Sequence, residues 1–282
     1  MKSIYLTIIT LLTTMSAALG QGNPTNLPPD ISDHLQTLSL PASRNYIVTH
    51  TYLKPFTNPD HSTKTGDSAP VVEYFDGLGR PIQRVAVRAS QSGGDMVDRQ
   101  DYDLAGNPEK QWLPYAMASN NGAYVTPSTF QSGQNTFLSG IYGTTDGSKG
   151  YAVTEYEKSP LSRVEKQGAP GAAWQTGTSD KPVKYAYRAN TSADNVQTWK
   201  YTGDNYSAYT YPAGSLFVTE SIDEDGKTVS EFNDKQGRLV MHLMGGSRTR
   251  YCYDEYGRLR CVVQPTATSP ASADNTFQYK YN

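Results

Sequence analysis

The sequence predicts an all-β fold of antiparallel hairpins with few or no long helices, and three observations support this class. A short turn frame with an acidic residue followed by glycine recurs five times along the chain. Tyrosine (21) far outnumbers phenylalanine (7), which suits half-exposed strands where the ring is buried and the hydroxyl reaches water. Glycine (24) and proline (17) supply many turns, below the content of low-complexity chains.

Length and composition bound the function. With 282 residues, 37% hydrophobic, 18% charged and a net charge of −2, the chain is expected to fold as one large or two modest domains. A pI near 6.1 disfavours a general nucleic-acid binder, which needs a basic face. Two cysteines cannot build a disulfide scaffold or a four-cysteine zinc site.

The first segment, residues 1–20, has the pattern of a secretory signal peptide. Lys2 precedes a mostly apolar stretch over Ile4–Leu12, and small residues follow up to Gly20. A membrane anchor is the alternative, but the apolar run is shorter than the roughly 20 residues that span a bilayer. We expect cleavage near Gly20/Gln21, export to the cell surface or medium through the periplasm, and no membrane-spanning segment in the mature chain.

Three further regions follow in order. Residues 21–45 are proline-rich and predict an extended lead-in with one short helix around Ile31–Leu38. Residues 46–182 predict an amino-terminal β domain whose later part, about 117–182, holds long loops; between 117 and 150 we expect loops with short strands. Residues 183–282 predict hairpin repeats.

The repeated frame is an acidic residue, two variable residues, glycine and usually a basic residue. Its three defining positions are occupied by Asp76, Gly79 and Arg80; Asp103, Gly106 and Asn107; Asp223, Gly226 and Lys227; Asp234, Gly237 and Arg238; and Asp254, Gly257 and Arg258.

Each frame predicts a hairpin corner. Aspartate at the first position of a type I turn accepts backbone N–H groups, and the glycine adopts the left-handed conformation that completes a three-residue loop with a bulge. The aspartate then lies opposite the residue after the glycine. One step further back, Phe75 pairs with Pro81 and Tyr253 with Leu259, on the other face of the sheet.

Here the chain resembles a known family. The stretch Tyr253–Leu259 reads Tyr-Asp-Glu-Tyr-Gly-Arg-Leu and matches the Tyr-Asp-x-x-Gly-Arg-Leu motif of RHS, or YD, repeats. The region from Asn45 to Tyr115 resembles the domain of unknown function that precedes these repeats in large secreted bacterial RHS proteins. The resemblance implies a curved or spiral sheet that closes as a shell around a C-terminal polypeptide, often a toxin. The family's Asp-Pro-x-Gly autocleavage motif has no counterpart here, so self-processing is not carried over.

The last residues resemble the opening of another repeat. Gln278–Asn282 alternates aromatic and polar residues, and Asn282 stands at the aspartate position. We therefore expect that the repeat is truncated and that the missing C-terminal part of the same polypeptide is the chief partner.

Two acidic clusters are candidate calcium sites. Asp223–Gly226 lacks a glutamate at the twelfth loop position of an EF-hand, and the hairpin interpretation explains the same residues without a metal. The second cluster, for which calcium stays an alternative to a solvated loop, consists of Asp95, Asp98, Asp101 and Asp103.

The two cysteines flank the last corner. In the predicted register Cys252 faces Arg260 and Cys261 faces Tyr251, so the thiols point to opposite faces and no disulfide forms within the hairpin.

No residue is predicted to be catalytic, and no cofactor or metal is expected. The sequence holds no Gly-x-Ser-x-Gly elbow, Walker loop or Gly-x-Gly-x-x-Gly motif. The predicted function is therefore a non-catalytic section of an exported RHS shell that encloses or displays a downstream polypeptide. The alternative is a secreted module that binds carbohydrate or cell-surface glycans through exposed tyrosines and Trp112, Trp174 or Trp199. A cluster of Arg248, Arg250, Arg258 and Arg260 among tyrosines is interpreted as ordinary sheet packing.

Overall fold

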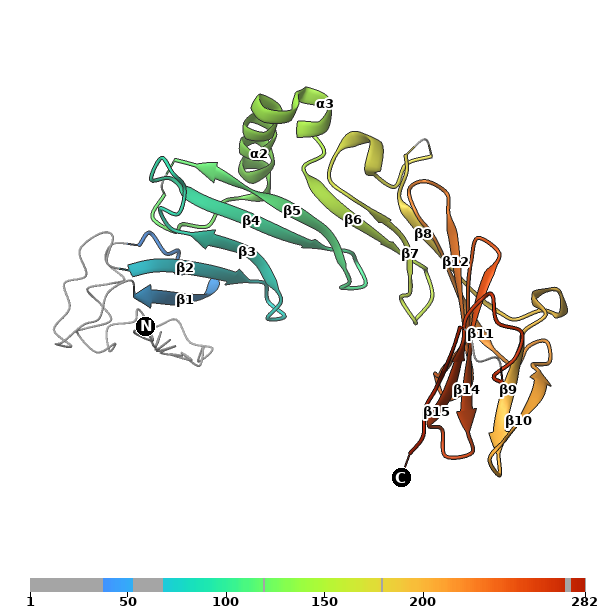
Figure 1. Ribbon diagram of the computed structural model, residues 1–282. Helices are drawn as coiled ribbons and strands as arrows, with labels where there is room; N and C mark the ends of the chain where they lie inside the picture. The colour runs from blue at the N-terminus through green and yellow to red at the C-terminus, as the bar shows by residue number, and fades with distance from the viewer. Residues whose placement is uncertain (1–37, 53–67, 119, 179, 272–274, 282) are drawn as a thin grey trace, which may run out of the picture. The chain divides into compact units, whose positions relative to one another are not determined.

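The computed structural model describes residues 38–52, 68–118, 120–178, 180–271 and 275–281. The expected signal peptide and the short helix around 31–38 fall outside these ranges, except for Leu38. Antiparallel strands dominate, so the all-β class is confirmed (Figure 1). The chain divides into two compact units, 1–153 with 169–175 and 154–168 with 176–282.

The first unit holds a sheet in which each strand pairs with the next along the chain. Its strands are β1 (Asn45–Tyr52), β2 (Ser68–Phe75), β3 (Pro81–Ala86), β4 (Asp95–Tyr102), β5 (Pro108–Met117) and the start of β6 (Tyr151–Tyr156). Its helices are α2 (Pro127–Tyr142), α3 (Thr144–Gly147) and the 3-10 turn η1 (Ala172–Trp174).

One face of this sheet is buried, as period-two alternation requires. The core includes Val72 and Tyr74 of β2, Val85 of β3, Val97 of β4 and Trp112 of β5. The segment after β5 covers this face through polar anchors. The Tyr74 hydroxyl donates to the Gly122 carbonyl at 2.6 Å, and the Gln83 amide exchanges two hydrogen bonds with the backbone of Val125.

Helix α2 corrects the expectation that residues 117–150 form loops with short strands. Its composition is poor for a helix, since it contains two glycines and several serines and threonines. Tertiary contacts override that propensity: Phe130, Gln134 and Leu138 are buried at four-residue spacing. Gly133 has a packing reason, because a Cβ there would lie 2.7 Å from the Tyr115 hydroxyl.

The second unit orders its main strands β7-β8-β11-β12-β13-β14-β15-β16. These are β7 (Val164–Gly168), β8 (Val183–Ala189), β11 (Phe217–Ile222), β12 (Thr228–Asn233), β13 (Leu239–Met244), β14 (Ser247–Asp254), β15 (Leu259–Val263) and β16 (Thr276–Gln278). The 3-10 turn η2 (Ser192–Asp194) leads to an inserted hairpin of β9 (Gln197–Thr202) and β10 (Asn205–Thr210), whose β9 pairs with β14 in parallel.

Two buried clusters support this unit. Val218, Phe232 and Met241 belong to one, and Cys252, Cys261 and Val263 to the other.

Replacing Phe232 tests the first cluster. Phe232 is fully buried, so Phe232→Ala is expected to lower the free energy of unfolding of this unit by about 3 to 5 kcal/mol in urea titrations. The matched control is Phe217→Ala in the adjacent strand, where the ring is 66% exposed and the change should stay within about 0.5 kcal/mol. Equal losses in the two variants would contradict this account of the core.

Candidate functional site

All five predicted frames lie at hairpin corners with the same backbone bonds. In each, the aspartate N–H donates to the carbonyl of the residue after the glycine, at 2.9 to 3.0 Å. The glycine N–H donates back to the aspartate carbonyl at 2.9 to 3.1 Å. The five glycines have positive φ, with φ between 77° and 93°. These are the bonds of a type I turn closed by a left-handed glycine.

The aspartate carboxylate organises each corner. At the last corner, Asp254 Oδ1 accepts the backbone N–H groups of Tyr256 and Arg258 at 3.0 and 2.9 Å. Its Oδ2 accepts from Nε of both Arg258 and Arg260 at 2.9 Å. Burial opposes ionisation of Asp254, but these hydrogen bonds and the cationic guanidinium groups outweigh it and lower its pKa to about 2.

The side-chain pair across the corner varies between copies. The Nε atoms of Arg80 and Arg238 each donate to their aspartate at 2.7 Å, and Asn107 Nδ2 donates to Asp103 at 3.0 Å. Lys227 differs, because its ammonium lies 3.7 Å from Asp225. The backbone geometry of the turn is therefore common to all five corners, while the side-chain interaction across the corner differs between copies.

Four corners carry a second irregularity that the sequence analysis missed. Directly after the first cross-strand pair, the register shifts by one residue on the return strand, and the bulged residues are Ile82, Glu109, Val240 and Arg260. The corner at Asp223 keeps an unshifted register.

This bulge overturns the prediction for the two cysteines. Tyr253 pairs with Leu259 as expected, but Cys252 then pairs with Cys261. The two thiols are direct cross-strand neighbours, and the argument that they face opposite sides was wrong.

Successive corners are joined by one tyrosine and one arginine. The Tyr102 hydroxyl donates to the Pro81 carbonyl at 2.8 Å, and the Arg80 guanidinium lies 4.3 Å from the centre of the Tyr102 ring. Tyr253 repeats both contacts with Leu239 and Arg238, at 2.9 and 5.0 Å. We call this pair of interactions the corner contact.

Two more corner contacts occur in the second unit. The Tyr281 hydroxyl donates to the Leu259 carbonyl at 2.9 Å, with Arg258 at 5.3 Å from its ring centre. Tyr187 makes the same two contacts with Val164 and Arg163, at 2.9 and 4.5 Å.

Arg163 belongs to a corner that the sequence analysis did not find. The Glu157 N–H donates to the Arg163 carbonyl at 2.9 Å, and two guanidinium nitrogens return bonds to the Glu157 carboxylate. Ser162 takes the left-handed place with φ of 48°. The frame is hard to recognise because glutamate replaces aspartate, serine replaces glycine and the loop is longer. The sequence signal that could have revealed this corner is Tyr156-Glu157 at its start and Arg163-Val164 at its end.

The acidic cluster at Asp95–Asp103 is divided among separate partners. Asp95 accepts backbone N–H groups of Arg88, Asn120 and Gly122. Asp98 pairs with Arg84 at 3.6 Å, and Asp101 accepts from Arg99 and Trp112, both at 2.7 Å. Among the residues that the structure describes, no three His, Cys, Asp or Glu side chains gather as metal ligands would.

The aromatic and basic residues considered for ligand binding lie mostly in packed positions. Trp112 is buried, Trp199 is partly buried with Arg250 over its ring at 6.0 Å, and Trp174 is 42% exposed. Burial, with a contribution from nearby Arg248, lowers the pKa of Arg250. These three indoles therefore do not form an exposed row.

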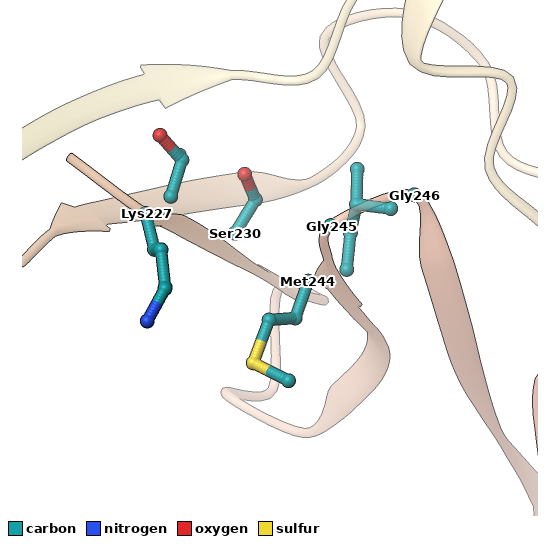
Figure 2. A pocket seen from close by; sticks show the side chains of 7 residues that line it. Lys227, Ser230, Met244, Gly245 and Gly246 are labelled. Carbon is teal, nitrogen blue, oxygen red and sulfur yellow. The ribbon is translucent and has the colours of Figure 1, made fainter. Parts of the chain in front are cut away.

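A shallow groove of about 480 Å³ lies in the second unit, between the start of β12 and the turn that joins β13 to β14 (Figure 2). Its lining residues are Lys227, Thr228, Ser230, Leu243, Met244, Gly245 and Gly246. Lys227 is the one charged residue in this set, so the lining offers no paired acid and base for catalysis.

The fold and the corners define an all-β protein of repeated hairpins. A family model described as Domain of unknown function (DUF6443) matches residues 48–189, which is just over half of the 282-residue chain. The chain belongs to this family. The match includes the corners at Asp76, Asp103 and Glu157.

Among solved structures, "Crystal Structure of TcdB2-TccC3-TEV" is similar over 79% of this chain, with 15% identity and a TM-score of 0.34. The chain spans 14% of the length of that structure's chain. None of the curated proteins matches the sequence. Within the described ranges, no helix is both long and apolar enough to cross a membrane.

The depressed pKa of Asp254 predicts acid sensitivity. An aspartate with a folded pKa near 2 and an unfolded pKa of about 3.9 stabilises the fold fully above about pH 4 and loses that contribution as the pH falls towards 2. In urea titrations between pH 5 and pH 2.5, Asp254→Asn should therefore flatten the loss of stability of the second unit. Asp225→Asn removes an exposed carboxylate and is the control for the loss of one negative charge. Identical profiles for wild type and Asp254→Asn would refute the prediction.

The glycines at two neighbouring corners make a second test. Gly237 and Gly257 have φ of 78° and 77°, so alanine at either should cost about 1 to 2 kcal/mol in backbone strain. A Cβ at Gly257 would also lie 3.1 Å from a guanidinium nitrogen of Arg238, whereas one at Gly237 meets no atom within 4 Å. Gly257→Ala is thus expected to cost more than Gly237→Ala in urea titrations. The difference should vanish in the Arg238→Ala background, and its persistence there would contradict the corner contact.

Proposed function

We propose that this chain is a non-catalytic structural part of an exported RHS-repeat protein. It forms the amino-terminal section of a β-shell that encloses or displays a downstream polypeptide. The observation that carries this proposal is the corner contact, which joins each participating hairpin to the next by a hydrogen bond from a tyrosine hydroxyl to a main-chain carbonyl and by a cation–π interaction. A fold built in this way extends by adding hairpins, as repeat arrays do.

The extension of the array is supported by Tyr281. This tyrosine contacts Leu259 and Arg258 as Tyr253 contacts Leu239 and Arg238. It therefore stands where the tyrosine of a further repeat would stand, which supports the proposal that residues 278–282 open one. Asn282, at the aspartate position, lies outside the described residues. The partner in this proposal is the continuing polypeptide.

Export is part of the same proposal. It is supported by the sequence of residues 1–20, with a lysine, an apolar stretch and small residues in that order. A protein that works outside the cytoplasm suits a role in enclosing or displaying a polypeptide at the cell surface or in the medium.

The test uses the product of the complete gene, including the coding sequence that follows codon 282. We expect further Tyr-Asp-x-x-Gly-Arg-Leu copies in frame, a mature amino terminus near Gln21 by terminal sequencing, and protection of the downstream polypeptide in limited proteolysis. Arg80→Ala, which removes a corner contact, should raise the cleavage rate of that polypeptide several-fold. Arg84→Ala is the matched control, since this half-exposed arginine of β3 forms a 3.6 Å ion pair with Asp98 and is not the arginine of a corner contact.

Three outcomes would contradict the proposal. One is a stop codon directly after codon 282, and another is equal protease sensitivity with and without Arg80. The third is specific turnover of a substrate by this chain alone. Binding to a glycan array that depends on Trp174 would instead support the carbohydrate-binding alternative.

A further inference from the structure

The last hairpin brings the only two cysteines of the chain together. Cys252 of β14 and Cys261 of β15 are direct cross-strand partners, because the bulge at Arg260 shifts the register by one residue. Directly opposed residues of an antiparallel pair have Cα atoms about 4.5 to 5.5 Å apart, within the range that a disulfide spans. Because they are paired directly across the two strands, the side chains share one face of the sheet, and both cysteines are buried.

Both thiols are enclosed. Cys252 is 1% exposed and Cys261 is fully buried, with Val263 and Ala267 in the same cluster. The inserted hairpin β9–β10 contributes the rings that pack against this cluster, Trp199, Tyr201 and Tyr206. Figure 1 shows β9 beside β14, and the two strands are hydrogen-bonded.

At the preceding corner, the pair in the equivalent register position belongs to the buried core. There the pair one step behind the bulge is Phe232 and Met241, and both side chains are fully buried. Two cysteines in the equivalent place fill far less volume than that pair. A covalent bond between them would fix the two strands to each other beneath the rings of the inserted hairpin.

We propose that Cys252 and Cys261 form a cross-strand disulfide bond in the mature protein. The oxidant is of the disulfide class, such as glutathione disulfide. The S–S bond of the oxidant breaks, an S–S bond forms between the two cysteines, and the two thiol protons pass to the two glutathione molecules released. The proposal rests on the proposed export only for the compartment in which oxidation occurs.

Burial sets the order of events. The interaction with the neighbouring Cys261 and burial raise the pKa of the Cys252 thiol, and the thiolate is the form that reacts. Oxidation therefore takes place before or during closure of the hairpin over the cysteines. Once formed, the bond is shielded from reductants until the unit unfolds.

The test refolds the purified full chain in glutathione buffers from reducing to oxidising, so that burial does not block oxidation. The products are unfolded, treated with an alkylating reagent and analysed by peptide mass spectrometry. We expect a linked peptide pair containing Cys252 and Cys261, two hydrogen atoms lighter than the two thiol peptides, with neither cysteine alkylated. Reduction should lower the Tm of the second unit by about 5 to 10 °C, a shift absent from the double variant Cys252→Ala/Cys261→Ala.

A matched control moves one thiol to the other face. In Cys261→Ala/Val262→Cys the new thiol pairs in register with Tyr251, so no bond with Cys252 is expected in the same buffers. Alkylation of both wild-type cysteines in oxidising buffer, or equal cross-linking in this control, would overturn the proposal. Export is assayed separately by the amino terminus at Gln21. An exported but fully reduced protein overturns the disulfide, whereas a retained protein overturns export and leaves the glutathione experiment to decide the disulfide.

Discussion

The corner contact is the interaction on which the repeated hairpins depend. Its tyrosine hydroxyl reaches the carbonyl just before the bulged residue, as at Pro81 before Ile82 and at Leu239 before Val240. A bulge interrupts the ladder of main-chain hydrogen bonds, so a donor from the neighbouring corner restores a partner at that interruption. The arginine that follows the turn glycine then lies over the ring of the tyrosine that donates this hydrogen bond. Turn, bulge and neighbour are therefore a single unit of structure.

At some corners, two separate features favour glycine. Positive φ alone favours glycine at every copy, and Ser162 shows that another residue can occupy this conformation. At Gly106 and Gly257, the arginine of the preceding corner also lies close, with guanidinium nitrogens 2.9 and 3.1 Å from where a Cβ would be. The glycine of one repeat thus makes room for the cation of another, which a single frame read alone does not reveal.

The sequence predicted what is decided locally. The Asp-x-x-Gly frame contains its own hydrogen-bonding groups and its own left-handed residue, so the turn and the first cross-strand pair followed from one short segment. The second bulge did not, because the groups that stabilise it come from the next corner. Helix α2 was missed for a related reason: its weak propensity is overcome by tertiary burial, with Phe130 packed against Trp112 and Tyr115 of β5. The cysteine faces were predicted wrongly because a register error of one residue reverses every side chain.

The middle copies show how far the corner contact can be replaced. Ile222 and Asn233 stand where a tyrosine would precede the aspartate, and the copy at Asp223 has lysine after its glycine and no second bulge. There, an ion pair joins two adjacent strands instead: the Arg188 guanidinium of β8 donates to the Glu220 carboxylate of β11 at 2.7 Å. Arg188 also donates to Asp194 at 2.8 Å. Where the bulge is absent the ladder is uninterrupted, so no tyrosine donor is needed. At the corners of Asp76, Asp234 and Asp254, by contrast, the bulge and the tyrosine donor occur together.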